Sequence, residues 1–254
     1  RSRYLTGWST MGKSIKAFAA LIALLFTVSI YAATEIELEP ALNDPDNVNS
    51  LQRGARNFMN YCSGCHSAQY VRFNTLGRDL NLSEEQLVNN LMFNAEKTFE
   101  TIAATMPMDE ALRWFGQAPP DLSLIARARG TDYVFNFLKG FYLDPDSPTG
   151  VDNRVLAGTS MPHVLWELQG FQNAVFSTDE NGIEHFESFE QVTPGSMSAE
   201  DYDEFVRDTT NFLEYISEPI RSTRRVLGVW VLIFLVFFWI IASMLKKQIW
   251  KDVT

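Results

Sequence analysis

The sequence predicts a mostly α-helical protein in which a loop-rich domain precedes one C-terminal transmembrane helix. Helix start and stop signals recur through residues 50–216, and a run of twenty uncharged residues lies near the C-terminus. Of the 254 residues, 46% are hydrophobic and 20% are charged, which excludes a wholly disordered or fibrous chain. This length favours one ordinary domain plus extra segments.

The N-terminal segment is typical of a secretory signal peptide. Residues 17–30 form a 14-residue apolar run behind Lys13 and Lys16, and small residues follow it. Such a run is short for a membrane span and has the flanks of a signal sequence. We therefore assign residues 1–33 to an N-terminal extension and signal peptide, with an uncleaved N-terminal anchor as the alternative.

The C-terminal segment, 221–254, is interpreted as a membrane anchor with a short cytoplasmic tail. Residues 226–245 contain no charge, and twenty residues of helix cover a hydrocarbon layer of ~30 Å. Three basic residues flank the span on each side, so the positive-inside rule gives no orientation. The signal peptide supplies it, because export of residues 34–220 places the C-terminus in the cytoplasm.

The predicted exported domain is strongly acidic. Residues 34–220 hold 30 of the 31 carboxylates and 11 of the 21 basic residues, a net charge of −19. This balance argues against nucleic-acid binding, which needs a basic face. The carboxylates serve either solubility or the docking of a basic partner, and the sequence leaves both open.

Local signals place several helices. Ser83 and Gln86 form a capping box for a helix that runs toward Phe93. Three helices end at glycines: Asp109–Phe115, Leu122–Arg129 and Tyr133–Lys139. A further helix opens at Ser198, with one apolar face formed by Tyr202, Phe205, Val206, Thr209, Phe212, Leu213 and Ile216. Strand alternation is weak and confined to residues 182–189.

The chemistry is expected at Cys62-Ser63-Gly64-Cys65-His66. These five residues form the C-x-x-C-H pattern of c-type haem attachment, in which two thiols bond to the porphyrin and the histidine ligates iron. The motif follows an apolar helical repeat from Leu51 to Cys62, for which Ser50 is the expected cap. One covalent haem c is therefore expected, with Cys62 and Cys65 as attachment points and His66 on the iron.

Three other interpretations of the cysteine pair remain open. A thioredoxin-like redox pair needs βαβ patterning around the motif, which this sequence lacks. A structural zinc site needs four ligands, and His163 and His185 stand far apart. A simple structural disulfide is the third. All three are less favoured than haem.

The second axial position of a haem iron requires another ligand, or stays open in a gas-binding or peroxidase site. The candidates downstream of the motif are Met92, Met106, Met108, Met161, Met197, His163 and His185. Met161 is the best of these, because Pro162 stiffens the loop that would present its thioether to iron. Most methionines only fill gaps in a core.

Several motifs together resemble the cytochrome c1 family. They are the C-x-x-C-H pattern, the block APPDLSLIARARG at residues 118–130, a Met-Pro loop and a C-terminal anchor. The resemblance covers roughly residues 48–250 and implies a cytochrome c-like haem domain with loop insertions. It implies that Arg129 pairs with a haem propionate, that Tyr133 lines the pocket, that Pro119 and Pro120 lie against the haem, and that Met161 is the axial methionine.

This resemblance also implies a function and partners. The protein would be the membrane-anchored electron carrier of ubiquinol–cytochrome c reductase (the cytochrome bc1 complex), alongside cytochrome b. It would take one electron from a Rieske iron–sulfur protein and pass it to a soluble c-type cytochrome, while another subunit oxidises quinol. It would lie in the bacterial inner membrane, within a dimeric complex, with its haem domain in the periplasm. Alternatives are a free-standing anchored cytochrome c, an open-site haem enzyme or sensor, and a thiol–disulfide exchange protein.

Overall fold

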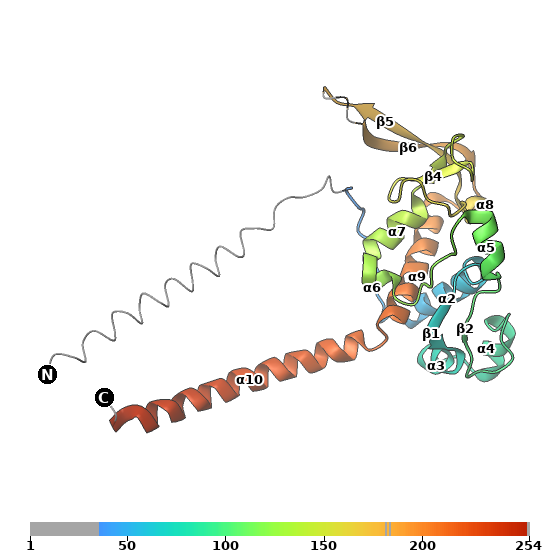
Figure 1. Cartoon of the computed structure of the whole chain (residues 1–254). Coiled ribbons are helices and arrows are strands. Elements are labelled where there is room, and N and C mark those ends of the chain that lie inside the picture. The colour runs from blue at the N-terminus through green and yellow to red at the C-terminus, as the bar shows by residue number, and fades with distance from the viewer. Residues whose placement is uncertain (1–35, 181, 183, 253–254) are drawn as a thin grey trace. The chain divides into compact units, whose positions relative to one another are not determined.

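A computed structural model describes residues 36–180, 182 and 184–252, so the predicted signal peptide lies outside the described residues (Figure 1). The described helices and strands belong to the unit formed by residues 38–254. The helices are α2 (Val48–Tyr61), α3 (Phe73–Asp79), α4 (Glu84–Asn90), α5 (Met108–Phe115), α6 (Ile125–Arg129), α7 (Thr131–Lys139), α8 (Trp166–Gln169), α9 (Ala199–Ser217) and α10 (Arg221–Ile249), followed by a 3-10 turn at Trp250–Asp252. The mostly α-helical prediction is confirmed.

Short antiparallel strand pairs connect these helices. The pairs are β1 (Ala68–Arg72) with β2 (Thr101–Ile102), β3 (Phe141–Leu143) with β4 (Val151–Asn153), and β5 (Gly170–Thr178) with β6 (Glu184–Pro194). The sequence indicated only a weak strand at residues 182–189, so most of the β5–β6 hairpin was missed. Register shifts beside Phe171 and Val175 interrupt its pairing, and such bulges break the period-two pattern that reveals a strand.

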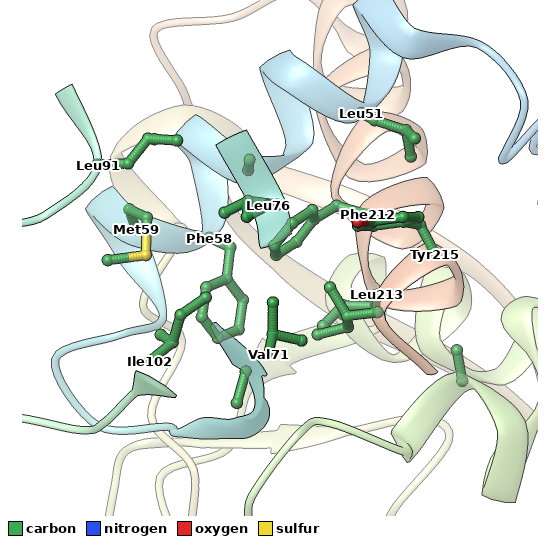
Figure 2. Close-up of a cluster of buried hydrophobic side chains, with 14 of the residues drawn as sticks. Leu51, Phe58, Met59, Val71, Leu76, Leu91, Ile102, Phe212, Leu213 and Tyr215 are labelled. Atoms are coloured by element: carbon green, nitrogen blue, oxygen red, sulfur yellow. The ribbon is translucent and has the colours of Figure 1, made fainter. Parts of the chain in front are cut away.

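The hydrophobic core lies where α2 packs against α9 (Figure 2). Phe58 and Phe212 are fully buried, and their ring centroids lie 5.5 Å apart. Gly54 permits this approach, because a Cβ there would lie 2.1 Å from the Asp208 carbonyl oxygen. Each buried phenylalanine contributes roughly 1.5–3 kcal/mol of transfer free energy. The helix that leads into the cysteine motif is therefore fixed to the longest helix of the domain.

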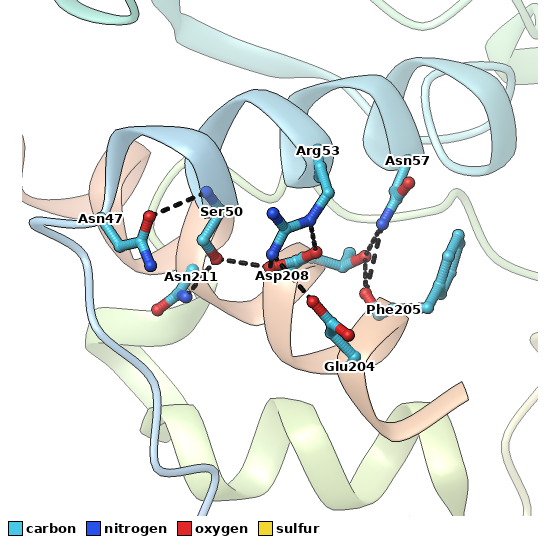
Figure 3. Close-up of polar contacts among 9 residues, drawn as sticks. Asn47, Ser50, Arg53, Asn57, Glu204, Phe205, Asp208 and Asn211 are labelled. Atoms are coloured by element: carbon cyan, nitrogen blue, oxygen red, sulfur yellow. Dashed lines mark hydrogen bonds and ion pairs between the residues drawn. The ribbon is translucent and has the colours of Figure 1, made fainter. Parts of the chain in front are cut away.

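A polar network joins the same two helices (Figure 3). The buried Asp208 carboxylate accepts hydrogen bonds from Ser50 and Arg53, while Asn57 donates to the Phe205 carbonyl at 3.2 Å. The prediction that Ser50 caps α2 is wrong. The helix begins at Val48, so Ser50 lies inside it, and Asn47 is the cap that accepts from the Ser50 backbone N–H at 3.2 Å. The Ser50 hydroxyl donates to Asp208 on α9 instead.

The other helix signals are largely confirmed. Ser83 and Gln86 form the expected capping box, α5 ends at the left-handed Gly116, and Ser198 caps α9. All seven residues of the predicted apolar face of α9 are buried. Three starts differ: α5 begins at Met108 rather than Asp109, α6 at Ile125 rather than Leu122, and α7 at Thr131 rather than Tyr133. The helix that opens at Ser83 ends at Asn90, short of Phe93.

The C-terminal helix α10 is long and apolar enough to cross a membrane, with a mean hydropathy of 2.7 over its most apolar window. None of that window is buried against the rest of the described chain. Twenty-nine residues of helix extend ~43 Å, which exceeds the hydrocarbon thickness. At its base, the Arg224 guanidinium binds the Glu218 carboxylate at 2.7 and 3.0 Å.

Candidate haem-binding site

The cysteine motif forms a tight turn at the end of α2. The backbone N–H groups of Cys65 and His66 both donate to the Cys62 carbonyl, at 3.0 and 2.8 Å. The Ser63 hydroxyl donates to the Met59 carbonyl at 2.8 Å and ties the turn to the helix. Cys62, Cys65 and His66 therefore lie in one hydrogen-bonded backbone turn at the end of α2.

Both cysteines are free thiols. Burial, together with the neighbouring Cys65, raises the pKa of the Cys62 thiol to about 12, and burial also raises the pKa of Cys65. Redox-active cysteines of the thioredoxin type have lowered pKa values. The surroundings of this pair therefore oppose the thiol–disulfide exchange alternative.

The His66 imidazole is positioned by a single backbone acceptor. Its ring is 9% exposed, and Nδ1 lies 2.8 Å from the Pro120 carbonyl oxygen. Because a carbonyl oxygen only accepts, Nδ1 must carry the proton, which leaves the Nε2 lone pair available to a metal. Burial lowers the pKa of His66, although Pro120 and Asp121 act in the opposite direction, and so favours the neutral form that binds metal.

Arg129 and Tyr133 lie together at the junction of α6 and α7. The exposed Arg129 guanidinium lies over the Tyr133 ring, 5.4 Å from its centroid, and Tyr133 stacks on Phe137 at 6.2 Å. Among the described residues no carboxylate pairs with Arg129. A free guanidinium beside an aromatic ring fits a haem propionate, since arginine holds carboxylates through two parallel hydrogen bonds.

Met161 lies in a loop that is fixed by the chain before it. The Asp152 carboxylate accepts from the Gly158 backbone N–H at 2.7 Å, and the Met161 N–H lies 3.4 Å from the Thr159 hydroxyl. Gly158 has φ 72°, a conformation that favours glycine. The Met161 side chain is half-buried and stays outside the hydrophobic core, so it is available as a ligand.

Sequence reasoning missed the structural role of His163. It was interpreted as a polar loop residue or an alternative ligand, but the ring is 6% exposed and stacks on Phe141 at 5.1 Å, with Phe171 packed edge-on at 6.3 Å. Burial lowers its pKa to about 4, which keeps the imidazole neutral. Phe141 in turn packs on Phe137, so ring contacts connect the Met161 loop with Tyr133. Only the tertiary fold reveals this aromatic series.

Within the described residues, no group of three or more His, Cys, Asp and Glu side chains is arranged to hold a metal ion. The cysteine–histidine turn, the mostly α-helical fold and the membrane-length α10 define the class of membrane-anchored c-type cytochromes.

Comparisons with known proteins identify the family. The Cytochrome C1 family matches residues 89–253. Cytochrome c1 of Allochromatium vinosum is 45% identical over 241 residues, which cover 94% of this chain and 99% of that protein. The ammonia monooxygenase gamma subunit of Nitrosomonas europaea is 38% identical over 95% of this chain and 99% of its own length. The mitochondrial cytochrome c1 heme protein of Saccharomyces cerevisiae is 27% identical, with coverages of 80% and 67%.

The chain therefore belongs to the cytochrome c1 family. Members of this family carry one covalently bound haem c and serve as the membrane-anchored haem electron-transfer subunit of the cytochrome bc1 complex.

Proposed function

We propose that this chain accepts one electron from a Rieske iron–sulfur protein and passes it to a soluble c-type cytochrome. The observation that carries the proposal is the hydrogen bond between His66 Nδ1 and the Pro120 carbonyl at 2.8 Å, because it leaves Nε2 of a buried, neutral imidazole as a metal ligand beside two free thiols. These features suit a haem c that stays attached to the chain through repeated oxidation and reduction.

The remaining roles follow from the residues around this turn. Cys62 and Cys65 would form the thioethers, and His66 and Met161 would be the axial ligands. Arg129 would pair with a propionate, while Tyr133 and Pro120 would line the pocket. The haem supplies reversible one-electron chemistry, and the chain supplies ligands, burial and orientation. On this account the subunit is an electron carrier and quinol is oxidised in another subunit.

Exposed apolar side chains on the helix next to the cysteine motif support docking of a redox partner. The Met106 backbone N–H donates to the Gly64 carbonyl at 2.9 Å, which places the start of α5 beside the motif. On α5, Met108, Leu112 and Trp114 are 65%, 50% and 59% exposed. A small apolar centre in an acidic domain suits a short encounter with a basic partner, because complementary charge accelerates association and small interfaces release quickly.

The predicted signal peptide and the membrane-length α10 support a placement in the membrane. The haem domain would lie in the periplasm and the tail after α10 in the cytoplasm of a bacterial inner membrane. In this position the domain meets a soluble acceptor while α10 holds it beside cytochrome b. We extend the proposal to a dimeric complex that contains cytochrome b and the Rieske protein.

Purification of the membrane complex tests this proposal. Affinity capture of the tagged full chain should co-purify cytochrome b and the Rieske protein, and a denaturing gel should show haem staining at the mass of this chain. Captured chain that stains for haem but brings neither subunit would favour a free-standing anchored cytochrome c. A five-coordinate reduced spectrum that readily binds carbon monoxide would favour an open-site haem enzyme or sensor.

A further inference from the structure

Asp121 connects the segment after the cysteine motif with the segment that supplies the histidine's acceptor. Its Oδ2 accepts hydrogen bonds from the Ser67 hydroxyl at 2.6 Å and from the Gln69 backbone N–H at 2.9 Å. Its Oδ1 accepts from the Ser123 backbone N–H at 2.8 Å. One carboxylate therefore binds both segments.

Two further hydrogen bonds close the same connection. The Leu122 N–H donates to the Ser67 carbonyl at 2.8 Å, and the Tyr70 N–H donates to the hydroxyl of the fully buried Ser123 at 3.1 Å. Residues 67–70 and 120–123 are thus joined by hydrogen bonds in which each segment both donates and accepts. We call these hydrogen bonds, including those of Asp121, the Asp121 latch.

The latch begins immediately after His66 and Pro120. Ser67 follows His66, and Asp121 follows Pro120, so the residues adjoining both partners of the 2.8 Å Nδ1–carbonyl contact are fixed. Partial burial raises the pKa of the Asp121 carboxyl, but hydrogen bonds from Ser123, Ser67 and Gln69 outweigh burial and hold the pKa below its ordinary value. The carboxylate therefore accepts all of these bonds in its charged form.

We propose that Asp121 is a positioning residue that holds the Pro120 carbonyl on His66 Nδ1 and thereby helps to set the reduction potential of the haem. The inference rests on the proposed function, because it requires His66 on the iron. A carbonyl that accepts from Nδ1–H makes the imidazole a more basic ligand, and a more basic ligand stabilises oxidised iron. Loosening the latch should therefore raise the potential.

Three variants of the intact, haem-loaded complex test the latch. Asp121→Asn keeps the shape but cannot accept at both former oxygen positions, and Ser67→Ala removes one latch bond without a change of charge. Asp109→Asn is the control, because it removes an exposed carboxylate from the first turn of α5 and leaves the latch intact. The readouts are a redox titration and the low-spin electron paramagnetic resonance signal of the oxidised haem.

Compared with Asp109→Asn, Asp121→Asn should raise the ratio of reduced to oxidised haem at a given potential by roughly threefold or more. At 59 mV per tenfold for one electron, this corresponds to a midpoint potential about 28 mV higher. Its resonance signal should also shift or broaden. Ser67→Ala should move both readouts less, in the same direction. Equal readouts for Asp121→Asn and Asp109→Asn would leave Asp121 as a turn residue only.

The proposal can still be tested if Asp121→Asn yields no haem-loaded complex, because Ser67→Ala then serves as the test variant. An unchanged reduction potential and an unchanged resonance signal in Ser67→Ala would contradict the proposed role of Asp121. Failure of the proposed function has a different signature. If His66 is not on the iron, His66→Ala leaves the resonance signal of the remaining haem unchanged.

Discussion

The two sides of the proposed haem site are built differently. On the His66 side, the turn, its histidine and the Pro120 carbonyl are joined by short hydrogen bonds between segments 54 residues apart. On the Met161 side, the ligand loop is held by Asp152 and by the stacking of His163 on Phe141. The first side is fixed by hydrogen bonds, whereas the second combines a hydrogen bond with aromatic packing. Changes on the two sides should therefore have different consequences.

The largest expected effect is on the His66 side. A Cys62→Ala, Cys65→Ala double variant removes both sulfur atoms, so covalent haem should be lost completely. Haem staining after denaturing electrophoresis measures this loss. Asp109→Asn, which leaves the motif intact, should stain like the parent chain. Undiminished covalent haem in the double variant would exclude these cysteines as attachment points.

On the other side, Met161→Leu should change the iron's ligation while covalent haem is retained. Loss of a thioether ligand should lower the midpoint potential by on the order of 100 mV, a fraction of the ~0.8 V that axial ligands span, and open the iron to carbon monoxide. Redox titration and carbon monoxide difference spectra measure both effects. Met106→Leu is the matched control. If that variant changes both properties and Met161→Leu changes neither, the assignment is wrong.

The contrast between the two sides also separates what the sequence predicts from what it does not. A contiguous motif specifies the CSGCH turn, so Cys62, Cys65 and His66 could be assigned from local chemistry. Resemblance to a family, rather than spacing, brought in Arg129, Tyr133 and Pro120. The stack of His163 on Phe141 depends on the fold of separate segments, and no local pattern indicates it. The cap of α2 was misassigned because the helix begins at Val48, before Ser50. The contact that the Ser50 hydroxyl makes instead, with Asp208 more than 150 residues away, also depends on the fold.

The polar network between α2 and α9 fixes the helix that leads into the cysteine motif on the His66 side. Asp208→Asn should destabilise the domain by about 1–3 kcal/mol, because Ser50 and Arg53 lose a buried charged acceptor. Thermal loss of the low-spin haem spectrum in the purified complex measures the change as a lower midpoint temperature. Glu204→Gln alters only an exposed contact with Arg53 and should cost no more than ~1 kcal/mol. Equal effects of the two variants would contradict a structural role for the buried Asp208 contacts.

Because His163 is packed as an aromatic ring on the Met161 side, we expect the stability of this side to depend on the shape of the side chain at position 163. His163→Ala should lower the thermal midpoint for loss of methionine ligation, because it removes a buried ring that stacks on Phe141. Such an aromatic pair contributes about 0.5–1.5 kcal/mol in addition to the burial of its apolar surface. His163→Phe should retain most of the stability, because the native ring is packed as a neutral aromatic group. The charge-transfer band of methionine-ligated ferric haem follows both variants. Loss of ligation in His163→Phe with retention in His163→Ala would contradict this account.

The smallest effect concerns docking, which involves neither ligand. The net charge of −19 on residues 34–220 should accelerate reduction of a basic soluble cytochrome c, and this rate should fall about tenfold from low to physiological ionic strength. Stopped-flow rates across a salt series measure the dependence, with an uncharged small-molecule oxidant as the control. A flat salt profile for the basic cytochrome would leave solubility as the role of the carboxylates.

The central claim is that the haem of this chain accepts electrons from a Rieske protein and passes them to a soluble cytochrome. Its most direct test is a time course of the haem spectrum after ubiquinol is added to membranes that contain the full complex. We expect the haem to be reduced only when a functional Rieske protein is present, and then to be reoxidised when oxidised soluble cytochrome c is added. Haem reduction by ubiquinol at an unchanged rate without the Rieske protein would contradict the account.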